Sequence, residues 1–449
     1  MKRYEAYKDS GKEWIGQIPQ GWVIMALKYC LSLKGRIGWN GLKSEEFEKE
    51  SYAYLVTGQD FKSDVVDWSK CYQINKERYD EDPFIQLENG DLLVTKDGTI
   101  GKVAKVSNLD KPACLNSGIF VVKQTKGLFV QDYLYWLLVS NQLKEFVGFN
   151  STGATIAHLY QNVFENMPLI IPSIQEQHFI ASYLNKKVGQ IDSSISAINT
   201  QIDELKSYRQ SIISEVVTRG LNPNVPMKDS GVEWIGQIPK DWDIFKLAPL
   251  TNKIGSGKTP TGGAEVYTDD GVMFIRSQNV YNDGLITDNV SFISDEINNT
   301  MLNSKVEYQD VLLNITGGSI GRSCFISDIN INANVNQHVC IIRCKKEKID
   351  PEFLHYLLIS SFIQNQIRAC QTGSNRDELN FEQIGKFITI VPSLTEQKEI
   401  VKYLDSMISK IDVTVKSLEN QRDDLNALKQ SVISEAVTGQ IDVRNWNNS

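Results

Sequence analysis

The sequence predicts an α+β protein in which two tandem mixed α/β globular domains are separated by two long antiparallel helices that form a coiled coil, with pseudo-twofold symmetry. Three observations predict it: an internal repeat, a capping signal before each of two helical segments, and a heptad pattern along both. The 449 residues exceed one ordinary core, and 41% hydrophobic with 23% charged residues is typical of globular protein. We therefore expect packed cores, two of which come from the repeat.

The repeat is one ancestral unit present twice. YKDSGKEWIGQIPQGW at 7–22 and MKDSGVEWIGQIPKDW at 227–242 are identical at 12 of 16 positions, with an offset of 220 residues. The same offset aligns 171–184 with 391–404, and 201–218 with 421–438. The interiors have drifted, although TKDGTIG at 95–101 still resembles ITGGSIG at 315–321. A shared frame with different interiors suits a protein that reads two things at a fixed separation, but plain drift after duplication would look similar.

Each long helix has a marked start. Ser173 with Glu176, and Ser393 with Glu396, have the spacing of a capping box and follow a proline. Apolar residues then alternate in steps of four and three, with Arg209, Arg422 and Lys429 interrupting. In the first segment they are Leu184, Val188, Ile191, Ile195, Ile198, Ile202, Leu205, Ile212 and Val216, and in the second Leu404, Ile408, Ile411, Val415, Leu418, Leu425 and Val432. This seam predicts paired helices, the alternative being that each helix packs only on its own domain.

The predicted boundaries follow from these starts. We expect a first globular domain at 1–173, a central helical spacer at 174–220, a second globular domain at 221–393 and a C-terminal helical spacer at 394–449. Strand-like runs include DLLVTKDGTIGKVAKV, GIFVVKQ, DVLLNITGG and HVCIIRC, while YLYWLL at 133–138 and FLHYLL at 353–358 are typical of short buried helices. Helices of about 40 residues would span about 60 Å, so they are expected to act as rods as well as core.

Composition excludes several classes of protein. No window approaches the roughly 18 apolar residues of a membrane span, and the start MKRYEAYKDSG lacks the apolar stretch of a secretory signal, so we expect a cytoplasmic protein. Seven cysteines without a CxxC pair are expected to be free thiols, and four scattered histidines predict no metal site. No cofactor is expected on this chain.

The negative net charge argues against a chain that binds nucleic acid over its whole surface. The net charge is −8, with 20 basic against 21 acidic residues in 1–173 and 15 against 20 in 221–393. Because affinity for a duplex comes largely from Lys and Arg, any DNA surface must be a local patch. We expect the chain alone to bind DNA weakly, with a basic partner supplying nonspecific attraction.

The candidate catalytic motifs in the sequence are incomplete or have another explanation. KIGSGKTP at 253–260 resembles a phosphate-binding loop, but the glycine that the pattern requires is Asn252. Asp82-Pro83-Phe84 lacks the second proline of an amino-methyltransferase motif, and Glu396-Gln397-Lys398, which resembles a nuclease fragment, is better explained by helix capping. The sequence therefore predicts a chain that is not an enzyme.

These features together resemble the specificity (S) subunit of type I restriction-modification systems, the HsdS family. The resemblance covers nearly the whole chain and rests on the repeated opening, IPSxxEQ at 171–177, VPSxxEQ at 391–397, GKTP at 257–260, FIRSQNV at 274–280, and the TG motifs STGAT at 151–155 and QTGSN at 371–375. It implies two target-recognition domains that each read half of a split sequence of double-stranded DNA, with the helices as a ruler. It also implies partners: two methyltransferase subunits that carry S-adenosylmethionine, and restriction (motor-nuclease) subunits that can join them.

Base reading is expected from polar loop side chains, with Arg on guanine and Asn or Gln on adenine, while Lys and Ser/Thr hold phosphates. In the first domain the candidate DNA-binding residues are Lys34, Arg36, Lys62, Lys96, Lys102, Thr152 and Thr155. In the second they are Lys258, Thr259, Arg276, Gln278, Asn279, Arg322, Ser374, Asn375 and Arg376. Ala154 and Ile156 stand where the second TG loop has Ser374 and Arg376, so the two loops cannot make identical contacts.

Two alternatives remain open at this point. One is a coiled-coil scaffold whose globular ends bind proteins and never touch DNA, which the acidic balance favours. The other is a cryptic nuclease, which incubation with DNA and magnesium would test. Lengthening the ruler by one heptad after Leu205 is expected to lengthen the unread gap between half-sites.

Overall fold

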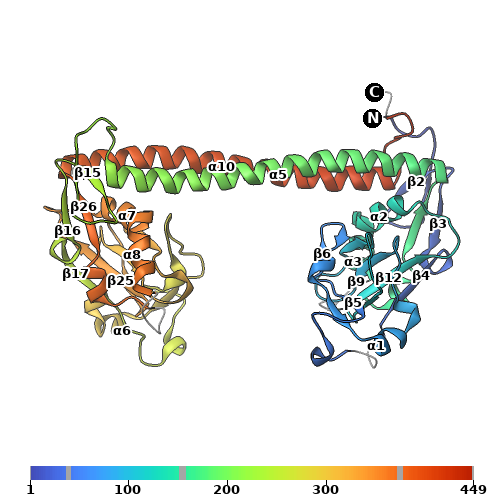
Figure 1. Ribbon diagram of the computed structural model, residues 1–449, viewed down its shortest axis with the longest axis horizontal. Helices are drawn as coiled ribbons and strands as arrows, with labels where there is room; N and C mark the ends of the chain where they lie inside the picture. The colour runs from blue at the N-terminus through green and yellow to red at the C-terminus, as the bar shows by residue number, and fades with distance from the viewer. Residues whose placement is uncertain (1, 37–41, 151–157, 372–377, 447–449) are drawn as a thin grey trace. The chain divides into compact units, whose positions relative to one another are not determined.

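The computed structural model describes residues 2–36, 42–150, 158–371 and 378–446. The chain divides into two compact units, the first made of Met1–Asn199 with Asn420–Ser449 and the second of Thr200–Glu419. Two long helices, α5 (Ile174–Arg219) and α10 (Leu394–Val437), each contribute one part to either unit. Each predicted spacer is thus divided between the cores that it helps to build (Figure 1).

The first unit is a mixed α/β structure. Its strands are β1 (Tyr7–Asp9), β2 (Gln17–Pro19), β3 (Val23–Ala26), β4 (Leu31–Gly35), β5 (Ala53–Val56), β6 (Phe61–Lys62), β7 (Val65–Val66), β8 (Tyr72–Ile74), β9 (Leu92–Thr95), β10 (Val103–Lys105), β11 (Ala113–Leu115), β12 (Ile119–Gln124) and β13 (Pro168–Ile171). Its shorter helices are α1 (Lys76–Asp80), α2 (Gln131–Val139), α3 (Asn141–Phe149) and α4 (Gln161–Phe164). The main sheets have the orders β4-β12-β9-β10-β7-β6 and β11-β5-β8, and the β11–β5 pair is parallel.

The second unit repeats these elements. Its strands are β14 (Met227–Asp229), β15 (Gln237–Pro239), β16 (Asp243–Lys246), β17 (Thr251–Ser256), β18 (Val272–Ile275), β19 (Val280–Tyr281), β20 (Gly284–Leu285), β21 (Ser291–Ile293), β22 (Val311–Asn314), β23 (Ser323–Phe325), β24 (Ala333–Val335), β25 (Val339–Cys344) and β26 (Ile388–Val391). Its shorter helices are α6 (Asp295–Asn299), α7 (Pro351–Ile359), α8 (Ser361–Gln371) and α9 (Phe381–Gly385). The orders β17-β25-β22-β23 and β21-β18-β24, with β18–β24 parallel, match those of the first unit.

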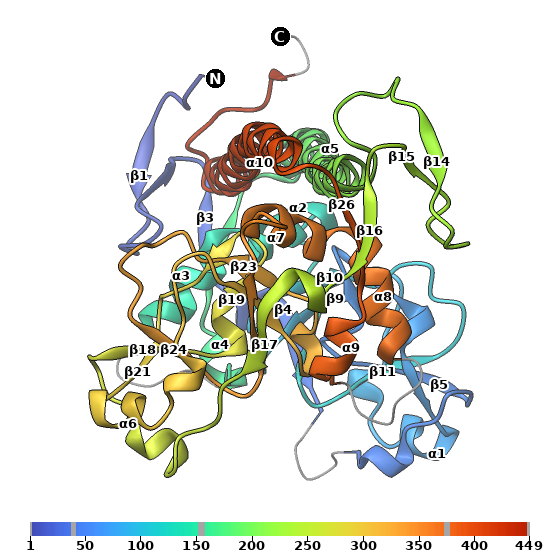
Figure 2. The same cartoon turned by 90° about the vertical axis from the view of Figure 1, so that its left-hand side faces the viewer.

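The predicted strand runs and short helices are confirmed. The runs correspond to β9 with β10, β12, β22 and β25, and the two apolar helical segments are α2 and α7. Both helices are buried because they lie between their sheet and the long helices (Figure 2). Their apolar residues run all round the helix, as a helix covered on both sides requires.

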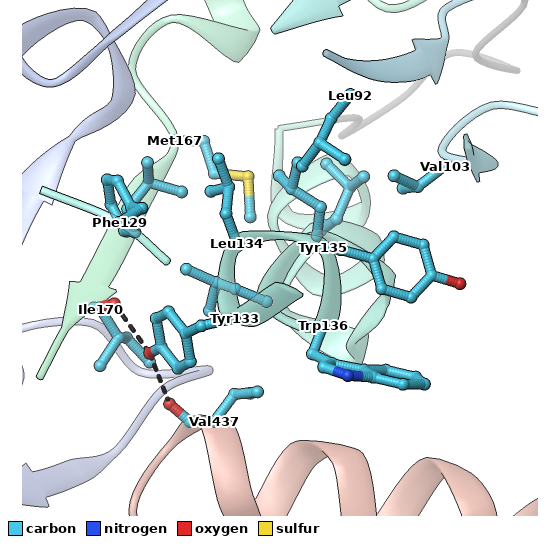
Figure 3. Close-up of a cluster of buried hydrophobic side chains, with 14 of the residues drawn as sticks. Leu92, Val103, Phe129, Tyr133, Leu134, Tyr135, Trp136, Met167, Ile170 and Val437 are labelled. Atoms are coloured by element: carbon cyan, nitrogen blue, oxygen red, sulfur yellow. Dashed lines mark hydrogen bonds between the residues drawn. The ribbon is translucent and has the colours of Figure 1, made fainter. Parts of the chain in front are cut away.

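The first core includes a hydrogen-bonded tyrosine at the junction of three elements. Tyr133 on α2 is fully buried, and its hydroxyl donates to the carbonyl oxygens of Ile170 at 2.9 Å and Val437 at 3.4 Å (Figure 3). Ile170 belongs to β13 and Val437 ends α10. The end of the C-terminal helix is thereby fixed into the first core, although it is more than 300 residues from Tyr133 in sequence.

Both capping signals lie at helix starts. Ser173 Oγ accepts from Glu176 N at 3.3 Å, and the Glu176 carboxylate accepts from Ser173 N at 3.3 Å, which forms the predicted box. At the second helix, Ser393 Oγ accepts from Glu396 N at 3.3 Å. The two glutamates also accept from buried indoles: Trp22 Nε1 donates to Glu176 at 3.1 Å and Trp242 Nε1 to Glu396 at 3.0 Å.

The long helices pack against each other within each unit, as the seam predicts. In the first unit Val188 on α5 is buried in one core with Ile433 on α10, and Lys429 pairs with Asp192 at 2.6 Å. In the second unit Ile213 shares a core with Ile400 and Leu404, and Arg209 pairs with Asp412 at 3.5 Å. The two numbers of each ion pair add to 621, as an antiparallel register requires. Two of the charged residues that interrupt the seam, Arg209 and Lys429, therefore support its register by pairing with the facing helix.

No helix within the described ranges has the length and hydrophobicity of a membrane span. The seven cysteines are free thiols, six of them buried, as predicted.

Candidate nucleic-acid interface

Three loops meet at one place in the first unit. They follow β5 (residues 57–60), join β9 to β10 (96–102) and join β11 to β12 (116–118). Asn116 N donates to Val56 O at 2.9 Å because β11 lies parallel to β5, and Lys96 N donates to Gly118 O at 2.9 Å. We call these three segments the first loop cluster. Backbone hydrogen bonds to a rigid sheet hold its side chains in position.

A cleft of about 560 Å³ opens at the first loop cluster. The rings of Phe47 and Tyr72 line part of it. The polar lining residues are Thr57, Gln59, Thr95, Asp97, Thr99, Lys102 and Asn116. Hydroxyl, amide, carboxylate and ammonium groups in one cleft can both donate and accept hydrogen bonds, which is the chemistry that base edges require.

The second unit forms the same cluster from residues 276–279, 315–322 and 336–338, which we call the second loop cluster. Asn336 N donates to Ile275 O at 3.1 Å and Ile315 N to His338 O at 3.0 Å, as their counterparts do in the first unit. Asn314 Nδ2 adds a bond to Ser277 O at 2.8 Å. The frame is the same in both units.

The side chains on this common frame differ. The turn after β5 is capped by Asp60, whose carboxylate accepts from Thr57 N at 2.7 Å, and the turn after β18 by Asn279, whose amide oxygen accepts from Arg276 N at 3.0 Å. Where the first cluster has Thr57, Lys102 and Gly118, the second has Arg276, Arg322 and His338. Gln59 and Gln278 occupy the same place in both.

The histidine of the second cluster is held at both ring nitrogens. His338 Nδ1 lies 2.6 Å from Thr316 Oγ1, and His338 Nε2 lies 2.9 Å from Gln337 Nε2. Thr259 Oγ1 donates to the Gln337 side chain. The first cluster places another histidine nearby, since His158 bonds to the Asp97 carboxylate.

Several cations of the clusters lie over aromatic rings. Lys96 lies 4.9 Å from the centre of the Phe120 ring, and burial lowers the pKa of its ammonium group although Asp97 opposes the shift. Arg276 lies over Tyr267 at 5.5 Å and Arg322 over Tyr281 at 4.6 Å. Within the described residues neither arginine has an ion-pair partner, so each guanidinium keeps donors available for a ligand.

The structure brings many of the candidate residues together. Lys96 and Lys102 belong to the first cluster, and Arg276, Gln278 and Arg322 to the second. Lys258 and Thr259 also reach the second, since Gly257 N donates to Asn336 O at 3.1 Å. This close contact between the two backbone segments leaves no room for a side chain at Gly257, because a Cβ there would lie 1.7 Å from Val335 O. Close packing therefore accounts for the glycine that resembled part of a phosphate-binding loop.

Other candidates lie elsewhere. Arg36 is 2% exposed and donates to Leu115 O at 2.9 Å, and Asn279 is 2% exposed in its capping turn, so the fold itself accounts for both. Lys34 on β4 lies over Phe84 at 5.7 Å, and Lys62 is exposed on β6. The five TG-loop candidates, Thr152, Thr155, Ser374, Asn375 and Arg376, lie outside the described residues.

Sequence reasoning did not select several residues of the clusters: Gln59, Asn116, Gln337 and His338. A signal for Gln59 was available, because TGQDF at 57–61 aligns with RSQNV at 276–280 once the strands before them are matched. No group of three or more His, Cys, Asp or Glu side chains in the described part of the chain is placed to hold a metal ion.

A frame that occurs twice and carries different polar side chains in the same loops is typical of a recognition protein. The family model "Type I restriction modification DNA specificity domain" matches residues 40–206 and 239–421. The chain therefore belongs to this family, the type I restriction-modification specificity subunits, and its function is DNA sequence recognition. Nothing in the comparisons supports a scaffold that never touches DNA.

Relatives span nearly the whole chain. The MjaVIII specificity subunit of Methanocaldococcus jannaschii is 27% identical over 453 residues, which cover 98% of either chain. The EcoBI specificity subunit of Escherichia coli is 27% identical over 359 residues, 78% of this chain and 73% of the relative. A solved structure described as "Structural basis underlying complex assembly and conformational transition of the type I R-M system" has a TM-score of 0.70 at 14% identity, covering 94% of this chain and 99% of that one, and shares the fold. Both named relatives are specificity subunits of type I restriction enzymes.

Proposed function

We propose that this chain reads a split sequence in double-stranded DNA, the first loop cluster reading one half-site and the second loop cluster the other. The observation that carries the proposal is the pair of matching backbone frames with different side chains: Thr57, Lys102 and Gly118 in the first unit, and Arg276, Arg322 and His338 in the second. Different donors and acceptors on one frame select different bases. The reading domains are then 1–173 and 221–393, and the helical spacers 174–220 and 394–449 separate them.

The helices act as a ruler in this proposal. Half-sites read from one face of a duplex are separated by about 34 Å for each helical turn, and a paired, ion-bridged helix fixes such a distance better than a flexible linker. Bases between the half-sites are then not read. In this proposal the helices of the protein set the distance between the two half-sites.

The partners supply the chemistry. We propose that two methyltransferase subunits, which carry S-adenosylmethionine, dock on this chain, that restriction subunits can join them, and that the complex works on DNA in the cytoplasm. With a net charge of −8, the chain gains from a basic partner most of the nonspecific attraction to phosphates. Fluorescence anisotropy with random duplex should therefore show weak binding by the chain alone and salt-sensitive binding by the complex.

The experiment that tests the ruler is a matched insertion. Because the helices are antiparallel, one heptad after Leu205 needs a second heptad after Val415, which keeps Arg209 and Asp412 in register. The two facing heptads together lengthen the paired helices by about 10 Å, or about three base pairs. Mapping methylated adenines in DNA treated with the complex should show a longer gap between unchanged half-sites. An undivided motif, or a gap that keeps its length, would contradict the proposal.

A further inference from the structure

A cavity in the first unit lies outside its loop cluster, between the β6–β7 turn, α2 and the long helices. Its volume of about 800 Å³ is typical of a site for a small organic molecule. All of its lining residues belong to the first unit, and among them are Asp64, Tyr135, Trp136, Val188, Gly189 and Lys429. We call it the helix cavity.

The wall of the helix cavity includes a buried hydroxyl. Tyr135 on α2 is 7% exposed, and its ring packs edge to face against Trp136 at 5.0 Å and points away from Tyr133 (Figure 3). Within the described residues the Tyr135 hydroxyl has no hydrogen-bond partner. Burial, and after it the nearby carboxylates of Asp64, Asp192 and Asp132, raise the pKa of this hydroxyl, so it stays protonated. It therefore bonds to the molecules that enter the cavity.

One carboxylate of the helix cavity is left without a counter-charge. Lys105 pairs with Asp132 at 2.8 Å, and Lys429 pairs with Asp192 at 2.6 Å. In the part of the chain that the structure describes, the partly buried Asp64 carboxylate forms no hydrogen bond or ion pair. These five groups together therefore carry one negative charge, which a ligand with one positive charge would balance.

The second unit satisfies the equivalent carboxylate with a side chain of its own. Arg209, which corresponds to Lys429 at the repeat offset of 220 residues, pairs with Asp412 at 3.5 Å and also with Asp283. Asp283 corresponds to Asp64, since each is the second residue of a two-residue turn between paired strands. A guanidinium thus joins the short hairpin to the long helix in the second unit, whereas the ammonium group of Lys429 leaves Asp64 unpaired.

We propose that the helix cavity binds a small organic cation, whose guanidinium or amidinium group pairs with Asp64 and bonds to the Tyr135 hydroxyl. The apolar body of the ligand lies against Trp136 and Val188. A metal ion does not fit, because no group of three or more His, Cys, Asp or Glu side chains in the described ranges is placed to hold one. The ligand does in the first unit what Arg209 does in the second, since it ties the β6–β7 hairpin to the long helix.

The test is calorimetric titration of the purified full chain with benzamidine, a flat aromatic amidinium, and with benzamide, its neutral counterpart. One benzamidine should bind to each chain with a dissociation constant below about 1 mM, and benzamide should bind at least about tenfold more weakly. The ionic pairing with Asp64 is the reason for this difference. Benzamidine that binds no more tightly than benzamide would overturn the proposal.

Three variants locate the site. Lys429→Arg gives the first unit the guanidinium of the second, so it should fill the place of the ligand and abolish benzamidine binding. Asp64→Asn should weaken binding at least about tenfold, because it removes the charge that pairs with the ligand. Gly189→Leu should block the cavity without a clash, since no atom lies within 4 Å of a Cβ at this position.

The matched control is Glu145→Gln, which removes an exposed carboxylate of the same unit outside the helix cavity and should leave benzamidine binding unchanged. Circular dichroism and thermal unfolding verify that each variant is folded. Wild-type affinity for benzamidine in any folded variant of the three would place the ligand elsewhere and overturn the proposal. Equal weakening in Glu145→Gln and Asp64→Asn would also overturn it, because general attraction to an acidic protein would then explain the binding.

Discussion

The hydroxyl of Tyr356 donates a hydrogen bond of 2.5 Å to Asp405 Oδ1, which ties α7 to α10 in the second unit. The first unit makes the equivalent tie with other groups, since Trp136 Nε1 donates to Asn185 Oδ1 at 2.8 Å. In both units a short buried helix is thereby joined to a long helix at the same place. The contact has survived duplication although every participating side chain has changed.

The charges around this tie have not been preserved. In the first unit Asp132 accepts from Lys105 at 2.8 Å and from Asn185 at 3.0 Å; burial opposes ionisation, but these bonds outweigh it and lower the pKa of Asp132. Glu352 and Phe325 take the places of Asp132 and Lys105 in the second unit. The second unit therefore lacks a cation at the place where Lys105 pairs with Asp132 in the first unit.

The absence of this cation predicts that the stability of the second unit depends on pH. Burial, with Asp405 and Asp350 nearby, raises the pKa of Glu352 to about 7, while Arg209 on α5 and Tyr356 on α7 are the other charged or titratable groups at the tie. Because the folded-state pKa lies above the unfolded value, stability is fully present below about pH 4.5 and is lost as the pH rises through about 7. After allowance for solvent screening the loss is about 1–2 kcal/mol.

Glu352→Gln should abolish this loss. Calorimetric unfolding at pH 5 and pH 8 should give the variant a smaller difference than the wild type, with the variant more stable at pH 8. Asp132→Asn is the matched control, since it removes a partner of Lys105 and should lower stability at pH 8. Equal pH slopes for wild type and Glu352→Gln would refute the assignment.

The buried hydroxyl of Tyr133 is expected to stabilise the end of α10. Tyr133→Phe leaves the Ile170 and Val437 carbonyls without this donor and should cost about 1–2 kcal/mol in the free energy of unfolding. The ring itself fits, because Phe353 occupies the equivalent position in the second unit. Hydrogen exchange at 433–437 should accelerate. Tyr135→Phe, whose hydroxyl points away from this junction (Figure 3), should change stability by less than about 0.5 kcal/mol.

Gly257 offers a test of whether GSGKTP is structural. Gly257→Ala would drive a Cβ into Val335 O, so it should destabilise the second unit by about 2–4 kcal/mol. Gly255→Ala is the control, because its Cβ would meet only Lys253 at 3.9 Å. Thermal unfolding should separate the two variants. Equal stabilities would show that the loop can move away and that close packing is not the reason for the glycine.

The sequence predicted the repeat and the long helices better than the two loop clusters. The sequence shows the repeat, the serines that start both helices and the seam as local patterns. Arg209 and Lys429 appear in it only as interruptions of the seam, because their ion-pair partners lie on the facing helix. The loop clusters depend on parallel pairs such as β5 with β11, strands about 60 residues apart that share no local signal. The inward position of Arg36 depends on the same pairing, because its acceptor is Leu115 on β11.

Arg322 is the residue that should define a base in the second half-site. Its guanidinium lies over Tyr281 at 4.6 Å, which leaves its donors for the paired acceptors of a guanine. Arg322→Gln should weaken recognition of one base pair by about 1–3 kcal/mol and leave the first half-site unchanged. Lys102→Gln, the equivalent change in the first cluster, should affect only the first half-site. The measurement is the methylation motif of each variant complex, mapped in treated DNA. If Arg322→Gln keeps the wild-type motif with wild-type selectivity, this arginine contacts no base. If the variant relaxes both half-sites equally, the arginine contributes to general affinity for the duplex.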